Sequence, residues 1–166
     1  MTGFAATARA IAAMTAAVAL ALAASCAPTP SDSPAAGDGH TIEQDTDMTT
    51  IDIDIHGTTF TAQLEDNATA RAFLDLLPTT LTMDELNGNE KYHYLDSSLP
   101  SEPQRVGTIH AGDIMLYGSD CIVLFYQTFR TPYSYTRIGS IADPGRLAHA
   151  LGAGAASVTF TPEQAA

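Results

Sequence analysis

The sequence has few basic residues and few cysteines, and it has no tryptophan. Lys and Arg together number 7 against 19 Asp and Glu, which gives a formal net charge of -12 at pH 7. A chain this acidic repels phosphate backbones, so its charge excludes sequence-independent nucleic-acid binding. Only 2 cysteines in 166 residues argue against a small fold held together by several disulfides.

Motifs for catalysis and metal binding are missing as well. The sequence has no Ser-His-Asp elbow, no phosphate-binding glycine loop and no paired-carboxylate motif. Its histidines have neither the i, i+4 spacing nor the paired cysteines of a usual zinc site; they are His40, His56, His93, His110 and His149. We therefore expect no metal and no cofactor, and the sequence favours a non-enzymatic role over an enzymatic one.

An apolar segment begins the chain, with Arg9 as its only charged side chain before Cys26. It ends in Leu22-Ala23-Ala24-Ser25-Cys26, which resembles the lipobox of bacterial lipoproteins. The resemblance implies that residues 1–25 are a signal peptide and that Cys26 carries a lipid. An ordinary secretory signal and an uncleaved anchor are the alternatives. Each of the three alternatives predicts that the chain is exported. The lipoprotein alternative also predicts that the lipid on Cys26 anchors it to the outer face of the cytoplasmic membrane.

A polar segment follows at residues 26–47. Pro28, Pro30 and Pro34 oppose helix formation, and five acidic residues keep the segment solvated. No apolar periodicity is present. We expect a disordered tether here, and residues 48–163 are then the folded domain, with six bases and fourteen acids.

The folded domain opens with a strand pattern. Isoleucines alternate with Asp52 and Asp54 along residues 51–55, a period of two that is typical of a strand with one solvated face. His56-Gly57 then predicts a hairpin turn. We interpret the two acids as the wet face of an edge strand, where they would discourage unwanted strand pairing.

Further patterns predict a mainly β fold. Strands are expected at 58–64, 81–86, 92–94, 114–117, 121–126, 135–141 and 158–161, helices at 66–77 and 143–151, and a loop at 97–104. Asp66 or Asn67 caps the first helix and Asp143 the second. About eight strands without a βαβ repeat favour an antiparallel β-barrel that closes on itself, with a helix over each open end.

Several short segments carry a family resemblance. In chain order they are Ile55, Phe60-Thr61-Ala62-Gln63-Leu64, Asp66-Asn67-Ala68-Thr69-Ala70, Leu77-Pro78, Glu90-Lys91-Tyr92, Ala111-Gly112-Asp113, Phe125-Tyr126 and Ile138-Gly139. Together they resemble the bacterial cyclophilin-like fold proteins over Met48 to about Pro162. The resemblance implies a closed antiparallel eight-stranded cyclophilin-like β-barrel capped by two short α-helices, and it implies no established activity.

True cyclophilins isomerise prolyl bonds with an arginine beside an apolar proline pocket. Their signature strand, Phe-His-Arg followed by Phe-Met-x-Gln, does not occur here, and no tryptophan is available to line the pocket. Arg137 could take the place of the arginine only by convergence. A divergent peptidyl-prolyl isomerase acting on exported proteins is therefore the alternative to our main reading.

Charged and aromatic residues on two of the predicted strands supply candidate ligand-binding residues. Tyr133, Tyr135 and Arg137 alternate and would share a face, which is either a cleft floor or a stripe of the barrel wall. Glu90 and Lys91 are either ligand-binding or a solvated or mutually paired couple. The candidates are Glu90, Tyr92, Tyr126, Tyr135 and Arg137.

The remaining chemistry-bearing residues have structural interpretations. Cys121 lies in an apolar run, which predicts a buried, unpaired cysteine. We interpret Asp113 as the cap of a turn. The sequence thus predicts a membrane-anchored, extracytoplasmic binding module for a peptide or small polar ligand at one rim of the barrel. A purely structural envelope component without a ligand is the third hypothesis.

Overall fold

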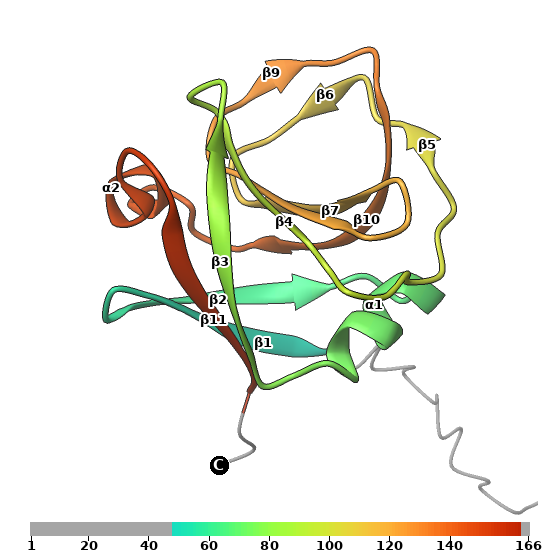
Figure 1. Ribbon diagram of the computed structural model, residues 1–166, viewed down its shortest axis with the longest axis horizontal. Helices are drawn as coiled ribbons and strands as arrows, with labels where there is room; N and C mark the ends of the chain where they lie inside the picture. The colour runs from blue at the N-terminus through green and yellow to red at the C-terminus, as the bar shows by residue number, and fades with distance from the viewer. Residues whose placement is uncertain (1–47, 164–166) are drawn as a thin grey trace, which may run out of the picture. The chain divides into compact units, whose positions relative to one another are not determined.

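The computed structural model describes residues 48–163, and Figure 1 shows the course of this part of the chain. The predicted signal peptide, the predicted tether and Cys26 lie outside the described residues. Between 48 and 163, no helix is both long enough and apolar enough to cross a membrane. The elements are β1 (Thr50–Ile55), β2 (Thr58–Leu64), α1 (Ala68–Leu74), β3 (Thr79–Leu86), β4 (Glu90–Tyr94), β5 (Gln104–Arg105), β6 (Thr108–Ile109), β7 (Asp113–Tyr117), β8 (Cys121–Phe125), β9 (Phe129–Arg130), β10 (Ser134–Ile141), α2 (Leu147–Leu151) and β11 (Ala156–Pro162).

Eight of these strands form a closed antiparallel barrel. Their order is β2-β1-β11-β3-β4-β8-β7-β10, and β10 pairs back onto β2. Closure leaves no unpaired strand in the ring, which removes the edges at which sheets aggregate. The predicted mainly β barrel with two short helices is confirmed.

Gly139 allows the barrel to close. It pairs with Leu64 of β2, just beyond a register shift in the pairing of β10 with β7. A Cβ atom at this position would lie 2.4 Å from the backbone oxygen of Gln63. Only glycine therefore permits the two backbones to approach this closely.

The prediction that Asp52 and Asp54 belong to an edge strand is wrong. β1 pairs with β2 on one side and with β11 on the other, so both neighbouring positions are occupied. The two acids do lie on the wetter face, since the isoleucines between them are buried. The period of two reveals that face, whereas the second neighbour of β1, strand β11, comes from the far end of the domain and leaves no mark on the pattern.

Helix α1 begins as predicted at Asn67, whose Oδ1 accepts a hydrogen bond of 2.8 Å from the amide of Ala70. It ends at Leu74 rather than at Leu77. The amides of Leu76 and Leu77 donate to carbonyls three residues earlier, so the last turn tightens into 3₁₀ geometry. The proline at position 78 disfavours the α conformation at the residue before it, which explains the early end.

Helix α2 is shorter than predicted and starts at Leu147. Asp143 accepts a hydrogen bond from the amide of Gly145 at 3.1 Å, which closes a turn before the helix instead of capping it. The cap position is Arg146, which makes no side-chain cap bond. Gly145 lies within the predicted first turn, and glycine is a poor helix former.

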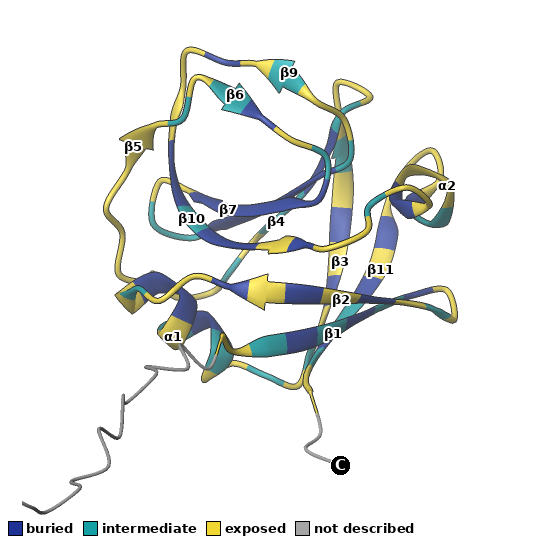
Figure 2. Ribbon diagram, turned by 180° about the vertical axis from the view of Figure 1, so that it is seen from behind, coloured by how far each residue is buried: buried dark blue, intermediate teal, exposed yellow. Residues whose placement is uncertain are grey.

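The barrel interior is the main core. Both helices contribute to it, through Ala70 and Phe73 of α1 and Leu147 and Leu151 of α2. Phe73 packs edge-on against Phe160 of β11, with ring centroids 5.4 Å apart. Figure 2 shows buried residues alternating with partly exposed ones along β1 and with exposed ones along most of β2, whereas β7 is buried along most of its length.

A second apolar cluster explains that continuous burial. It lies on the outer face of the wall formed by β4, β8, β7 and β10, and β6 and β9 pack over it. Its members are Ile109, Met115, Cys121, Val123, Phe125 and Tyr135, with Tyr92, Val106 and Phe129 packed against them. β8 is therefore buried on both faces, as the continuous apolar run at 121–126 predicted.

Candidate functional site

A cleft of about 430 Å³ lies against the outer face of the wall, where the second cluster leaves part of the surface open. β4 contributes Glu90, Tyr92 and Tyr94 to it, because alternate residues of a strand point to the same side. Tyr135 of β10 and Tyr133 just before that strand line the opposite side. The cleft thus lies on the outside of the barrel wall and not inside the barrel.

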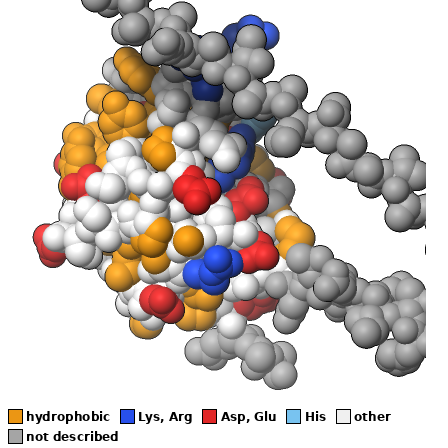
Figure 3. Space-filling view, turned by 90° about the vertical axis from the view of Figure 1, so that its right-hand side faces the viewer, with side chains coloured by type: hydrophobic (Ala, Val, Ile, Leu, Met, Phe, Trp, Pro, Cys, Tyr) orange, Lys and Arg blue, Asp and Glu red, His pale blue; other side chains and the backbone are white. Residues whose placement is uncertain are grey.

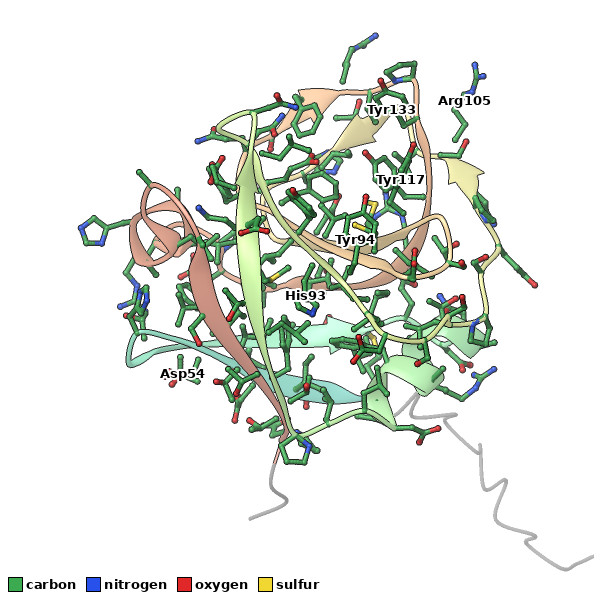
Figure 4. The ribbon with its side chains drawn as sticks, in the orientation of Figure 1. Asp54, His93, Tyr94, Arg105, Tyr117 and Tyr133 are labelled. Carbon is green, nitrogen blue, oxygen red and sulfur yellow. The ribbon has the colours of Figure 1, made fainter. Side chains whose placement is uncertain are left out.

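Tyrosine rings dominate the lining of this cleft, which we call the tyrosine cleft. The rings of Tyr92 and Tyr94 meet edge-on, with centroids 5.9 Å apart. The ring centroid of Tyr117 lies 5.5 Å from that of Tyr135 and 6.3 Å from that of Tyr133. Figure 4 shows Tyr94, Tyr117 and Tyr133 in one region, with Arg105 farther out.

These rings form an unusual amount of open aromatic surface. Tyr94, Tyr117 and Tyr133 are 60%, 44% and 59% exposed. Hydrophobic side chains also gather at the upper left of the face seen in Figure 3. Apolar patches of this kind on a folded surface mark sites of interaction.

Glu90 is the acidic residue of the tyrosine cleft. Its side chain is only 9% exposed, and no described residue donates a hydrogen bond to its carboxylate or forms an ion pair with it. Burial, together with the nearby charge of Glu85, raises the pKa of Glu90. A largely buried carboxylate that has no protein partner and borders an open cleft is a candidate group for binding a ligand.

Asn89 adds a second unsatisfied acceptor beside Glu90. Its Oδ1 atom is buried without any hydrogen-bond partner, and the residue lines the same cleft. Buried side-chain oxygens are nearly always hydrogen bonded in folded proteins. The cleft is therefore bordered by two acceptors without a described partner, the carboxylate of Glu90 and the enclosed Oδ1 atom of Asn89.

Two further groups of the cleft, Cys121 and Tyr135, hold their protons at neutral pH. Burial, followed by the charge of Asp120, raises the pKa of the Cys121 thiol to about 11. Burial and the charge of Glu90 raise the pKa of Tyr135 to about 12. Cys121 is free and buried, as the sequence predicted, and a protonated thiol is a poor nucleophile.

Lys91 and Tyr126 belong to a separate network on the inner side of the wall. The fully buried ammonium of Lys91 donates to Glu85 and to the backbone oxygens of Gly152, at 3.0 Å, and Gly154. The Tyr126 hydroxyl donates to Glu85 Oε1 at 2.7 Å. The expectation that Glu90 and Lys91 are solvated or pair with each other is wrong, because successive strand residues point to opposite faces.

The same network sets the acidity of its members. Burial by itself acts to raise the pKa of Glu85, but hydrogen bonds from Lys91, Tyr126 and the Gly88 amide together lower it. Burial and the adjacent Glu85 raise the pKa of Tyr126 to about 12. All three N–H donors of Lys91 are used, so we interpret this network as structural: it links β3, β4 and the segment after α2.

Arg137 lies in a second, more polar groove. It shares the outward face of β10 with Tyr135, as the alternation predicted, and Tyr135 borders both grooves. Its Nη1 atom is 3.6 Å from Asp113 Oδ1, and Asp113 also accepts from the amide of His110 at 2.9 Å, as a turn cap. Arg137 is therefore held beside Asp113 and outside the tyrosine cleft.

Three of the five sequence candidates thus come together: Glu90, Tyr92 and Tyr135. Tyr94, Tyr117 and Asn89 also line the cleft but are not among the sequence candidates, and Tyr133 entered only through its alternation with Tyr135. The alternation of 90, 92 and 94 along one strand was the signal that could have added Tyr94. Among the described residues, no group of three or more His, Cys, Asp or Glu side chains could hold a metal ion.

Comparisons with known proteins address the family. A model of the cyclophilin-like family matches residues 53–161. The solution structure of a hypothetical protein from Archaeoglobus fulgidus is similar, with 18% identity, coverage of 69% of this chain and 95% of that one, and a TM-score of 0.46. No curated protein matches the chain. The family model spans nearly the whole barrel and confirms the predicted resemblance: the chain belongs to the cyclophilin-like family.

Proposed function

We propose that this chain is a non-enzymatic binding module that holds a small polar ligand, or a side chain of a peptide, in the tyrosine cleft. The observation that carries the proposal is the nine-tenths buried, unpartnered carboxylate of Glu90 in an aromatic cleft. Burying such a group costs free energy that the fold does not recover by itself. A ligand that donates hydrogen bonds to it supplies the missing interaction.

The size and lining of the cleft support this function. A volume of about 430 Å³ lies within the range of small-molecule sites, which typically combine aromatic walls with a few polar groups. The tyrosines are also suited to binding because their rings are rigid and amphipathic.

The protonation states of Cys121 and Tyr135 argue against nucleophilic catalysis by these two groups. A side chain that acts as a nucleophile or a base must be able to lose its proton near neutral pH. The raised pKa values of Cys121 and Tyr135, about 11 and about 12, leave both groups protonated there.

Nuclear magnetic resonance titration of the purified full chain tests the proposal. The probes are a set of small cationic, anionic and neutral polar compounds and short peptides. We expect at least one class to shift the resonances of Tyr92, Tyr135 and Asn89. Binding confined to the groove of Arg137, or no binding by any class, would overturn it.

We further propose that the module is exported and anchored to the membrane through a lipid on Cys26. The support is the lipobox-like Leu22-Ala23-Ala24-Ser25-Cys26 at the end of the apolar segment. Metabolic labelling with palmitate should mark the wild type and the control Cys121→Ala, but not Cys26→Ala. An unlabelled wild type would contradict the anchor.

A further inference from the structure

The chemistry of the tyrosine cleft also indicates the class of its ligand. We propose that the cleft binds a protonated alkylamine, with the ammonium group against Glu90 and Asn89 and the alkyl chain among the tyrosine rings. This inference rests on the proposed function, because it specifies the ligand of the same cleft.

The need for a positive charge follows from Glu90. A carboxylate that is nine-tenths buried is stable as an anion only when a cation or several donors lie next to it. The nearest base in the sequence, Lys91, points to the other face of β4 and is fully engaged there. Arg130 lines the cleft from β9, but its side chain is exposed and forms no ion pair with a described residue. A cation beside the ionised form of Glu90 would therefore be supplied by a ligand.

The aromatic walls favour the same charge. The faces of aromatic rings carry negative partial charge and attract ammonium groups, most strongly where water is excluded. Tyr92, Tyr117 and Tyr135 bring such rings from three strands around one cleft. Leu86 and Val123 also line it and provide apolar contact for the carbon chain of an amine.

The two unsatisfied acceptors define the type of amine. Glu90 offers carboxylate oxygens and Asn89 a buried, unpaired Oδ1 atom, and both require N–H donors. A primary ammonium group has three such donors, so it can donate to Glu90, and to Asn89 once that side chain turns its oxygen toward the cleft. A trimethylammonium group keeps the charge but has no donor, so the cleft should distinguish the two.

Calorimetric titration of the full chain at pH 7.5 tests the inference. The probes are n-butylamine, Nα-acetyl-lysine amide, and the ε-acetyl and ε-trimethyl forms of that lysine derivative. Butylamine represents a free small amine and the lysine derivative a peptide side chain. We expect binding of one or both, weakened at least about tenfold by ε-acetylation and by a smaller factor by ε-trimethylation, since loss of a buried charge pair is the larger effect.

Two variants complete the test. Glu90→Gln should weaken binding of the amine by at least about tenfold, whereas the matched control Glu163→Gln, at an exposed position after β11, should leave it unchanged. Equal binding of the acetylated and charged probes, or of wild type and Glu90→Gln, would overturn the amine as ligand. If a neutral or anionic compound then shifts the cleft resonances, the proposed function stands and only this inference fails. If no compound does, both fail.

Discussion

Replacement of Lys91 by methionine should destabilise the barrel strongly. Methionine keeps most of the volume of the lysine stem but removes the charge and all three donors. Lys91 is fully buried, and its loss leaves Glu85 and the carbonyls of Gly152 and Gly154 without their partner. Breaking a buried ion pair from one side typically costs about 3–5 kcal/mol.

The expected loss lies near the lower end of that range. The Glu85 side chain is 25% exposed, so water can partly hydrate the carboxylate that is left behind. We therefore expect the free energy of unfolding to fall by about 3 kcal/mol. Because small domains have about 5–15 kcal/mol in total, the variant should still fold.

Urea unfolding at pH 7, followed by circular dichroism, measures this change. Arg71→Met is the control, because the ion pair of Arg71 with Asp66 is exposed on both sides (63% and 86%) and should contribute at most about 1 kcal/mol. The double variant Lys91→Met/Glu85→Gln should lose less than the sum of the single losses, since the partners share one interaction. A decrease in the free energy of unfolding below about 1 kcal/mol for Lys91→Met would refute the structural role of Lys91.

Three further predictions follow from single residues. In urea unfolding at pH 8, Glu90→Gln should be more stable than wild type. Because the pKa of Glu90 is raised in the folded state, the folded chain releases this proton at a higher pH than the unfolded chain, and wild-type stability falls as the pH rises through that pKa. A variant no more stable than wild type would contradict this. Gly139→Ala should lose about 1–3 kcal/mol, because the new Cβ atom would lie 2.4 Å from the Gln63 oxygen, and an unchanged melting temperature would show that the strands can separate freely. In a protease-coupled assay with a proline peptide, we expect no turnover by wild type above background, whereas turnover that disappears in Arg137→Ala would establish the isomerase alternative.

Most of the barrel was predictable from the sequence because its strands carry readable patterns. The alternating isoleucines of β1 and the apolar run of β8 each indicate a strand and the burial of its faces. β5, β6 and β9 were missed, since each has only two residues and is too short to show any period. The pairing of β1 with β11, which removes the edge expected at Asp52, joins strands from opposite ends of the folded domain.

The candidate site was predictable only in part, for a related reason. Alternation shows that Tyr135 and Arg137 share a face of β10, but it cannot show that this face crosses two grooves. Tyr126 is a candidate from the sequence, yet its hydroxyl is bound to Glu85 on the other side of the wall. The unpaired state of Glu90 became visible only when every neighbouring donor had been placed.

The central claim is that the tyrosine cleft binds a ligand through Glu90 and the rings around it. Intermolecular nuclear Overhauser effects between the full chain and Nα-acetyl-lysine amide test it most directly. We predict contacts from the ε-methylene protons of the probe to the ring protons of Tyr92 and Tyr135, and their loss in Glu90→Gln. Contacts to the groove around Arg137 instead, or contacts that persist unchanged in Glu90→Gln, would contradict the account.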